Sequence, residues 1–185
     1  GETRQFVPAE YSIKNDLYSQ NQIDFIDKYL NNLFKIVYEA CENGKYYKFD
    51  ENYDLVDSDV TTAEEAVSNV MDIDSVRDMY ILYEIVHDYD CGEGSFYMCV
   101  DLSKDSKCPK LKFTSPWDFN WAYNDSTEKY YAGAFTDKNF VAKKGDRSNP
   151  WFIILCKQDW FMDAVKEKWT EMSQEKLLQG CIKTE

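Results

Sequence analysis

Two aspartates, Asp90 and Asp118, flank a stretch of sequence that is typical of a β-hairpin, and they are the residues best placed for chemistry. Residues 95–101 and 110–114 are rich in aromatic and β-favouring side chains, so they are expected to form the two strands. Neighbouring strands lie ~5 Å apart, which would bring both carboxylates within reach of one metal ion. Carboxylates at helix and strand ends are also common as caps and turn formers, and the spacing alone favours that purely structural role.

Other kinds of chemistry find little support in the sequence. It contains no GxSxG or HExxH motif, no phosphate-binding loop and no dinucleotide-binding fingerprint. His87 is the single histidine, and a lone histidine at a helix end is more often a cap or a surface group than a catalyst. The six cysteines form no CxxC pair, so a structural zinc site is not expected. One disulfide among Cys91, Cys99 and Cys108 stays open as an alternative, because a secreted protein would permit it.

Length, composition and charge restrict the class of protein further. The 185 residues suit one domain, and 44% hydrophobic and 16% aromatic residues provide enough apolar surface for a core, which excludes a disordered chain. The formal net charge is −13, so phosphate backbones and anionic lipid surfaces would be repelled. Nucleic acid and membranes are therefore not expected as partners. No apolar run approaches the ~20 residues of a membrane span.

The strongest predicted helix follows an irregular lead-in over residues 1–18. Ser19 and Gln22 form a capping-box pattern, and apolar residues recur after them at spacings of three and four up to Cys41. Asn43–Gly44 is typical of a helix end. Residues 45–60 are acidic and aromatic without a sustained period, so they are expected to be irregular.

The rest of the chain predicts further helices around the single hairpin. Thr62 is expected to begin a short helix that reaches Met71, and Asp74 to cap a second, central helix. Asn149–Pro150 is typical of a helix start, and the helical pattern that follows predicts two helices separated near residues 157–159. A last short helix is predicted over residues 173–180. The fold class is therefore α+β and predominantly helical.

The segments YDCGEGSFYMCVD (residues 89–101) and KLKFTSPWDFNWA (residues 110–122) resemble the CotH kinase family, the atypical protein kinases linked to spore coats. Members carry a D-x4-N element, an aromatic strand and a P-W-D-x-D block. Glu84 stands at the position of the family's usual glutamate, in a similar helix before the first aspartate. The resemblance extends from about residue 20 to residue 172 and implies an atypical protein-kinase-like C-lobe whose small hairpin carries an acidic site.

The resemblance also implies roles for individual residues, with Mg²⁺ and ATP as cofactors. Asp90 would accept the proton of the attacking hydroxyl, and Asp118 would bind the metal. Ser95 stands where the family has a metal-binding asparagine, and Asn120 where it has the second aspartate of its W-D-x-D block. Both departures keep an oxygen donor but lower the expected affinity for the metal. The substrate implied is a serine or threonine hydroxyl of a surface or spore-coat protein.

Kinase-like folds hold the nucleotide phosphates with a lysine from a β-rich N-terminal lobe, and residues 1–18 are too short to supply that lobe. Residues 19–185 are therefore expected to be the C-lobe of a longer protein, or a natural remnant of such a fold. The resemblance implies a location at the cell surface, secreted or in a spore coat. The 185 residues alone are not expected to transfer phosphate efficiently. A non-catalytic surface or adhesion module that keeps the fold is the main alternative. A Ca²⁺-stabilised extracellular domain is less favoured, because no EF-hand-like D-x-D-x-D-G spacing occurs.

Overall fold

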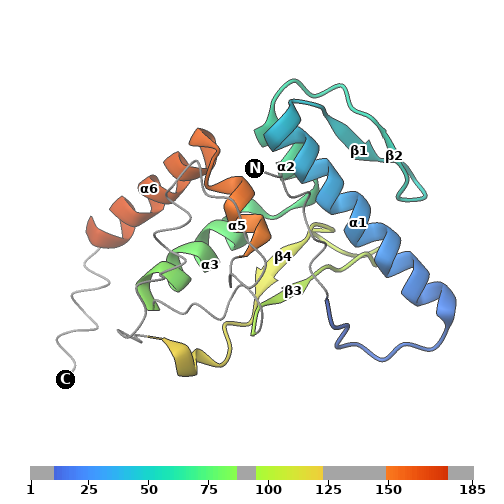
Figure 1. The fold of residues 1–185 in the computed structure, drawn as a ribbon, viewed down its shortest axis with the longest axis horizontal. Coiled ribbons are helices and arrows are strands. Elements are labelled where there is room, and N and C mark those ends of the chain that lie inside the picture. The colour runs from blue at the N-terminus through green and yellow to red at the C-terminus, as the bar shows by residue number, and fades with distance from the viewer. Residues whose placement is uncertain (1–10, 87–94, 123–148, 175–185) are drawn as a thin grey trace, which may run out of the picture. The chain divides into compact units, whose positions relative to one another are not determined.

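The computed structural model describes residues 11–86, 95–122 and 149–174, and these residues belong to two compact units (Figure 1). The first unit contains residues 11–70, and the second contains the described residues from Met71 onward. The fold is α+β and mostly helical, with one small antiparallel hairpin in each unit, which confirms the predicted fold class at this level. Within the described ranges, no helix combines the length and the apolar character needed to cross a bilayer.

Helix α1 (Gln20–Asn43) dominates the first unit, and its ends have the local chemistry that the sequence predicted. The Ser19 hydroxyl accepts from the amide of Gln22, whose side chain accepts in return from the amide of Ser19 at 3.2 Å. Gly44 ends the helix in the left-handed conformation, with φ of 62°. Helix α2 (Ala63–Val70) packs against α1. The core of the unit combines the Tyr29 ring with small and branched apolar side chains: Leu33, Ile36, Val37, Ala40, Ala66, Val67 and Val70.

The prediction that residues 45–60 are irregular was wrong, because they form the hairpin of strands β1 (Tyr47–Phe49) and β2 (Leu55–Asp57). The turn of this hairpin packs against α1 through aromatic rings and one ion pair. The ring of Tyr29 packs on Phe49 and on Tyr53, with centroids 5.3 and 5.6 Å away. The Lys28 ammonium lies 2.7 Å from the carboxylate of Asp54. Three-residue strands carry too little sequence pattern to be recognised, so contacts with α1 decide this structure.

The second unit is built around helix α3 (Ile73–Val86), which has buried residues on several sides. Its N-terminal cap is not Asp74, as the sequence analysis predicted, but Asp72. The carboxylate of Asp72 accepts from the amide of Ser75 at 3.3 Å, whereas Asp74 pairs with Arg77 at 2.7 Å. The reason is tertiary, because the amide of Asp72 donates to the carbonyl of Leu111 at 2.9 Å and so holds the chain at the helix start.

Strands β3 (Tyr97–Cys99) and β4 (Lys112–Thr114) pair antiparallel, with Tyr97 opposite Thr114. The hairpin is where the sequence predicted it, although each strand is shorter. Its β4 strand packs on α3. Cys99 and Cys108 are free thiols, so the structure has no disulfide between them, and Cys91 lies outside the described residues. The Cys108 thiol lies 3.8 Å from the Asp72 carboxylate.

Helices α5 (Pro150–Leu155) and α6 (Asp159–Gln174) confirm the predicted pair of helices and the break between them. The side chain of Asn149 accepts from the amides of Trp151 and Phe152 at 3.0 and 3.3 Å. Every residue of α5 after Pro150 is buried, and α6 packs on α3. Most of the helix predicted over residues 173–180 falls outside the described residues.

Candidate functional site

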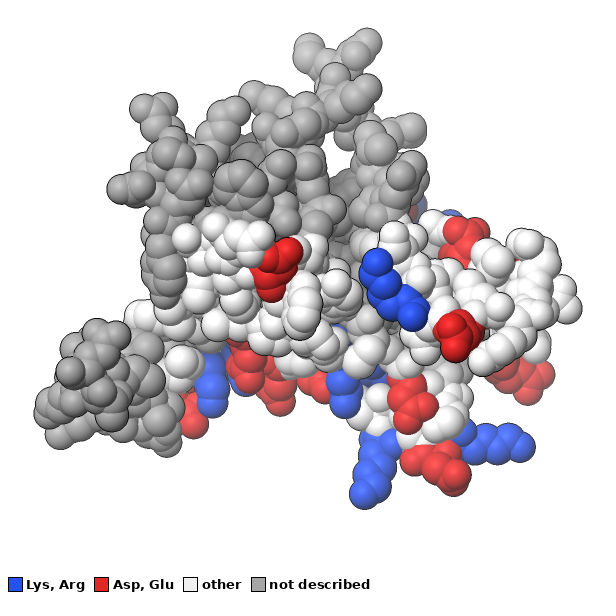
Figure 2. All heavy atoms as spheres, turned by 90° about the horizontal axis from the view of Figure 1, so that it is seen from below, with Lys and Arg blue, Asp and Glu red and all other residues white. Residues whose placement is uncertain are grey.

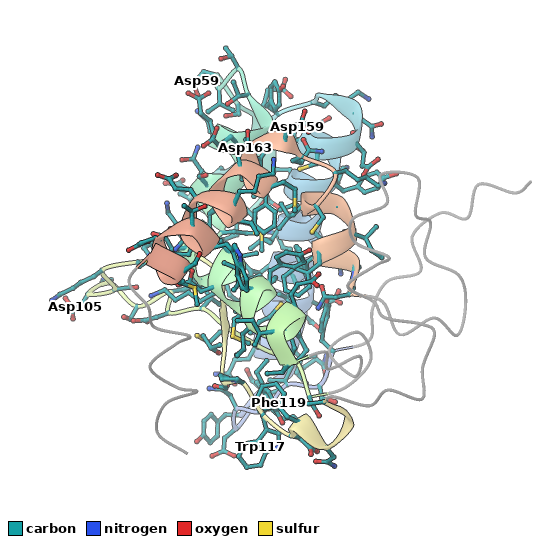
Figure 3. The ribbon with its side chains drawn as sticks, turned by 90° about the vertical axis from the view of Figure 1, so that its left-hand side faces the viewer. Asp59, Asp105, Trp117, Phe119, Asp159 and Asp163 are labelled. Atoms are coloured by element: carbon teal, nitrogen blue, oxygen red, sulfur yellow. The ribbon has the colours of Figure 1, made fainter. Side chains whose placement is uncertain are left out.

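Three of the four predicted site residues lie at the open end of the β3–β4 hairpin. Ser95 lies two residues before β3. Asp118 lies after β4, directly before the short helix η2 (Phe119–Trp121), and Asn120 lies within η2. Since Tyr97 pairs with Thr114, the residues just before β3 and just after β4 belong to the same end of the hairpin. Figure 3 shows Trp117 and Phe119 together at this end, well apart from Asp105 in the turn. Asp90 and His87 lie outside the described residues.

A buried aromatic ring connects the segments that carry these residues. Tyr83 on α3 has no exposed surface, and its ring centroid lies 6.1 Å from that of Phe96 and 6.0 Å from that of Phe119. Phe96 directly follows Ser95, and Phe119 stands between the two candidate ligands after β4. The aromatic cluster therefore holds both arms of the hairpin's open end to helix α3, the helix that precedes Asp90 in the sequence.

Backbone conformations that are unfavourable for ordinary residues concentrate at the same place. Four of the described non-glycine residues have a positive φ angle, and three of them lie here: Ser95 (49°), Ser115 (53°) and Asp118 (61°). The other is Tyr53, in the first unit. Such conformations cost about 1–3 kcal/mol each and persist only where the surroundings enforce them, often at functional sites. The open end of the hairpin is therefore held in a shape that its own backbone does not favour.

The carboxylate of Asp118 is not used as a helix cap, which was the structural role that its spacing favoured. The residue stands at the N-cap position of η2, yet its side chain makes no capping hydrogen bond and is exposed. The amide of Asn120 is exposed as well, and Ser95 is half-buried. A carboxylate, an amide oxygen and a hydroxyl are all hard oxygen donors, the kind that Mg²⁺ binds.

The geometry of a complete metal site does not follow from these residues alone. Among residues 11–86, 95–122 and 149–174, no group of three His, Cys, Asp or Glu side chains is close enough to hold a metal ion. Of the predicted metal ligands in these ranges, Asp118 alone is a His, Cys, Asp or Glu. The other two are the amide of Asn120 and the hydroxyl of Ser95. The donor types fit Mg²⁺.

Glu84, at the position of the family's usual glutamate, belongs to a buried polar group on the core side of α3. The side chain of Tyr80, one turn earlier on the helix, is hydrogen-bonded to Glu84 and to Cys156. Burial, followed by the neighbouring Cys156 and Glu84, raises the pKa of the Tyr80 phenol well above its usual range. Burial likewise raises the pKa of the Cys156 thiol. Both groups therefore keep their protons at neutral pH, and the Tyr80 phenol is the donor in its hydrogen bond with the Cys156 sulfur.

Two features of the site were missed in the sequence. Trp117 is 63% exposed beside Asp118, although a tryptophan next to a strand is ordinarily buried. The second feature is the place of Tyr83 between Phe96 and Phe119, which depends on contacts distant in sequence. The position of Trp117 directly before the candidate ligand Asp118 was the one feature of the sequence that could have indicated its exposure.

Comparison with known proteins gives one match. The family model described as CotH kinase protein matches residues 13–183, which include the hairpin, the site residues and the flanking helices. No curated protein and no solved structure matches the chain. The family match confirms the resemblance carried by residues 89–101 and 110–122.

Proposed function

Because the chain belongs to the CotH kinase family, we propose that it is the helical C-lobe of an Mg-ATP-dependent protein kinase that phosphorylates serine or threonine hydroxyls. The observation that carries the proposal is the placement of Asp118. Within a match that covers nearly the whole chain, the aspartate of the P-W-D block is exposed, unused as a cap and held in a strained conformation. A carboxylate kept in this way suits a ligand better than a structural role.

The proposed roles follow the requirements of phosphoryl transfer. Bound Mg²⁺ would neutralise charge on the nucleotide phosphates. Asp118 is proposed as its charged ligand, with the Asn120 amide oxygen and the Ser95 hydroxyl as weaker donors. Asp90 is proposed to orient the acceptor hydroxyl and take its proton. Because Asn120 lacks the charge of a carboxylate, we expect weaker metal binding than a second aspartate would give.

The proposed partners are ATP and a protein at the cell surface, secreted or in a spore coat, in keeping with the family's link to spore coats. The net charge of −13 argues against nucleic acid. On the face drawn in Figure 2, acidic and basic side chains are interspersed rather than gathered into one basic patch. The nucleotide-binding lysine is not assigned to any residue of this chain.

Replacing Asp118 by asparagine in the full-length protein tests this proposal. The substitution keeps the size of the side chain and removes the charge, so we expect ATP-dependent labelling of a protein substrate to be lost. Asp105→Asn is the matched control, because Asp105 is an exposed aspartate in the turn at the other end of the same hairpin (Figure 3). Labelling by the Asp118→Asn protein at the level of the Asp105→Asn protein would refute the proposal.

A second candidate function is a non-catalytic surface or adhesion module with the same fold. The exposed indole of Trp117 favours it, because a solvent-facing tryptophan is an effective contact for a protein or glycan. The departures at Ser95 and Asn120 also favour it. Calorimetric titration with Mg²⁺ and ATP separates the two functions, since a pure adhesion module releases no binding heat.

A further inference from the structure

We propose that Tyr83 is a positioning residue for the site: its ring fixes Asp118 and Asn120 relative to helix α3 by holding Phe119 between them. Tyr83 has no exposed surface, and the Phe119 ring packs edge-on against it at 6.0 Å with an interplanar angle of 62°. This is the T-shaped arrangement that aromatic pairs prefer. The inference depends on the proposed function for the role of Asp118, but the positioning itself has an independent test.

The same ring reaches the other arm of the hairpin's open end. Phe96 lies 6.1 Å from Tyr83 and 4.8 Å from Phe113, whose side chain is buried in β4. The segment that carries Ser95 and the segment that carries Asp118 therefore share one contact on α3. Because the core is close-packed, neither segment moves independently while the Tyr83 ring is in place.

The strained backbone shows why such a contact is needed. Asp118 has φ of 61°, a conformation that a non-glycine residue leaves unless its surroundings hold it. Its side chain makes no capping hydrogen bond, so that bond does not supply the restraint. The ring of the next residue, Phe119, packs against Tyr83, and this contact can supply the restraint. We infer that loss of the Tyr83 ring releases η2 and lets Asp118 relax away from its strained conformation.

Tyr80 provides a matched control on the same helix. It is a tyrosine with 3% exposure, one turn further from the end of α3, and its ring packs on Phe152 and Phe161. Tyr80→Leu removes as much buried ring as Tyr83→Leu does. A general loss of core packing would therefore affect both variants, whereas a positioning role predicts a local effect of Tyr83→Leu alone.

The test is hydrogen exchange followed by mass spectrometry on peptides that cover residues 114–122. In Tyr83→Leu we expect exchange there to be at least ~10-fold faster, while Tyr83→Phe matches the parent and Tyr80→Leu leaves this segment unchanged. Equal acceleration by Tyr80→Leu and Tyr83→Leu, or no acceleration by either, would overturn the inference. If Tyr83→Leu does not fold, Phe119→Leu removes the same contact from the half-buried side and must give the same local acceleration.

A kinetic measurement on the full-length protein connects positioning to catalysis. We expect Tyr83→Leu to lower kcat at least ~10-fold relative to Tyr80→Leu, with the KM for the protein substrate nearly unchanged and with rescue by Tyr83→Phe. If the variants show the expected differences in hydrogen exchange but the full-length parent protein transfers no phosphate, the proposed function is refuted and the positioning role is kept. Unchanged kcat in Tyr83→Leu would refute the catalytic half of the inference.

Discussion

Replacing Ser75 by alanine is expected to destabilise the second unit by about 2 kcal/mol. The Ser75 hydroxyl donates to the carbonyl of Asp72 at 2.8 Å and accepts from the amide of Phe113 at 3.2 Å. The Asp72 carbonyl keeps a bond from the amide of Val76 at 3.1 Å, so little is lost there. The Phe113 amide belongs to a buried residue and loses this partner. A buried donor left without a partner costs about 1–3 kcal/mol, and about 2 kcal/mol corresponds to ~30-fold in the unfolding equilibrium.

Urea unfolding followed by tryptophan fluorescence measures this loss in the right part of the molecule, because all five tryptophans follow Val70 in the sequence. The control is Ser173→Ala. The Ser173 hydroxyl also bonds a backbone carbonyl, that of Trp169 at 2.6 Å, but on the exposed part of α6. We expect a change within about 0.5 kcal/mol there. If Ser75→Ala is no more destabilising than Ser173→Ala, the hydroxyl bridge between α3 and β4 does not contribute as argued.

Two further predictions concern the pH dependence of the first unit and the strain in the second. Burial, with a smaller contribution from Tyr53, raises the pKa of Tyr29 to about 12. The unfolded chain therefore loses this proton first as the pH rises from 10, and stability falls by about 2–3 kcal/mol by pH 12. Urea unfolding followed by circular dichroism should show a smaller fall in Tyr29→Phe, and an unchanged fall would contradict the assignment. Ser115→Gly relieves a positive φ of 53° and should stabilise the second unit by about 0.5–1 kcal/mol. A lower Tm for this variant would contradict the strain.

The parts of the fold that were predicted correctly are those in which neighbouring residues determine the structure. The ends of α1 depend on Ser19, Gln22 and Gly44, which act within a few residues of one another. The break between α5 and α6 is likewise a local feature. The β1–β2 hairpin was missed because its three-residue strands depend on the Tyr29 ring, eighteen or more residues away.

The choice between Asp72 and Asp74 as the cap of α3 shows the same limit on a smaller scale. Both are aspartates near the helix start, and local preference does not separate them. The hydrogen bond from the Asp72 amide to Leu111 in the hairpin decides the matter. Nothing near residue 72 in the sequence indicates that contact.

For the candidate site, the sequence led to a prediction of the site residues but gave no indication of their backbone conformation. The P-W-D block and its family resemblance identified Asp118 and its neighbours. The left-handed backbone at Ser95 and Asp118 was not predictable, because only a few per cent of non-glycine residues adopt it and nothing near these positions in the sequence singles them out. The Tyr83 ring contacts Phe96 and Phe119, the residues that follow Ser95 and Asp118, and these contacts join segments that are distant in sequence.

The division into two units has a consequence for synthesis on the ribosome. Every described residue of the first unit precedes Met71, so α1, the β1–β2 hairpin and α2 have their mutual partners once residue 70 has left the exit tunnel. Domains generally fold as units, N-terminal first, while translation proceeds. This unit is therefore expected to bury Leu33 and Ile36 before either of the aspartates proposed for the site has left the exit tunnel.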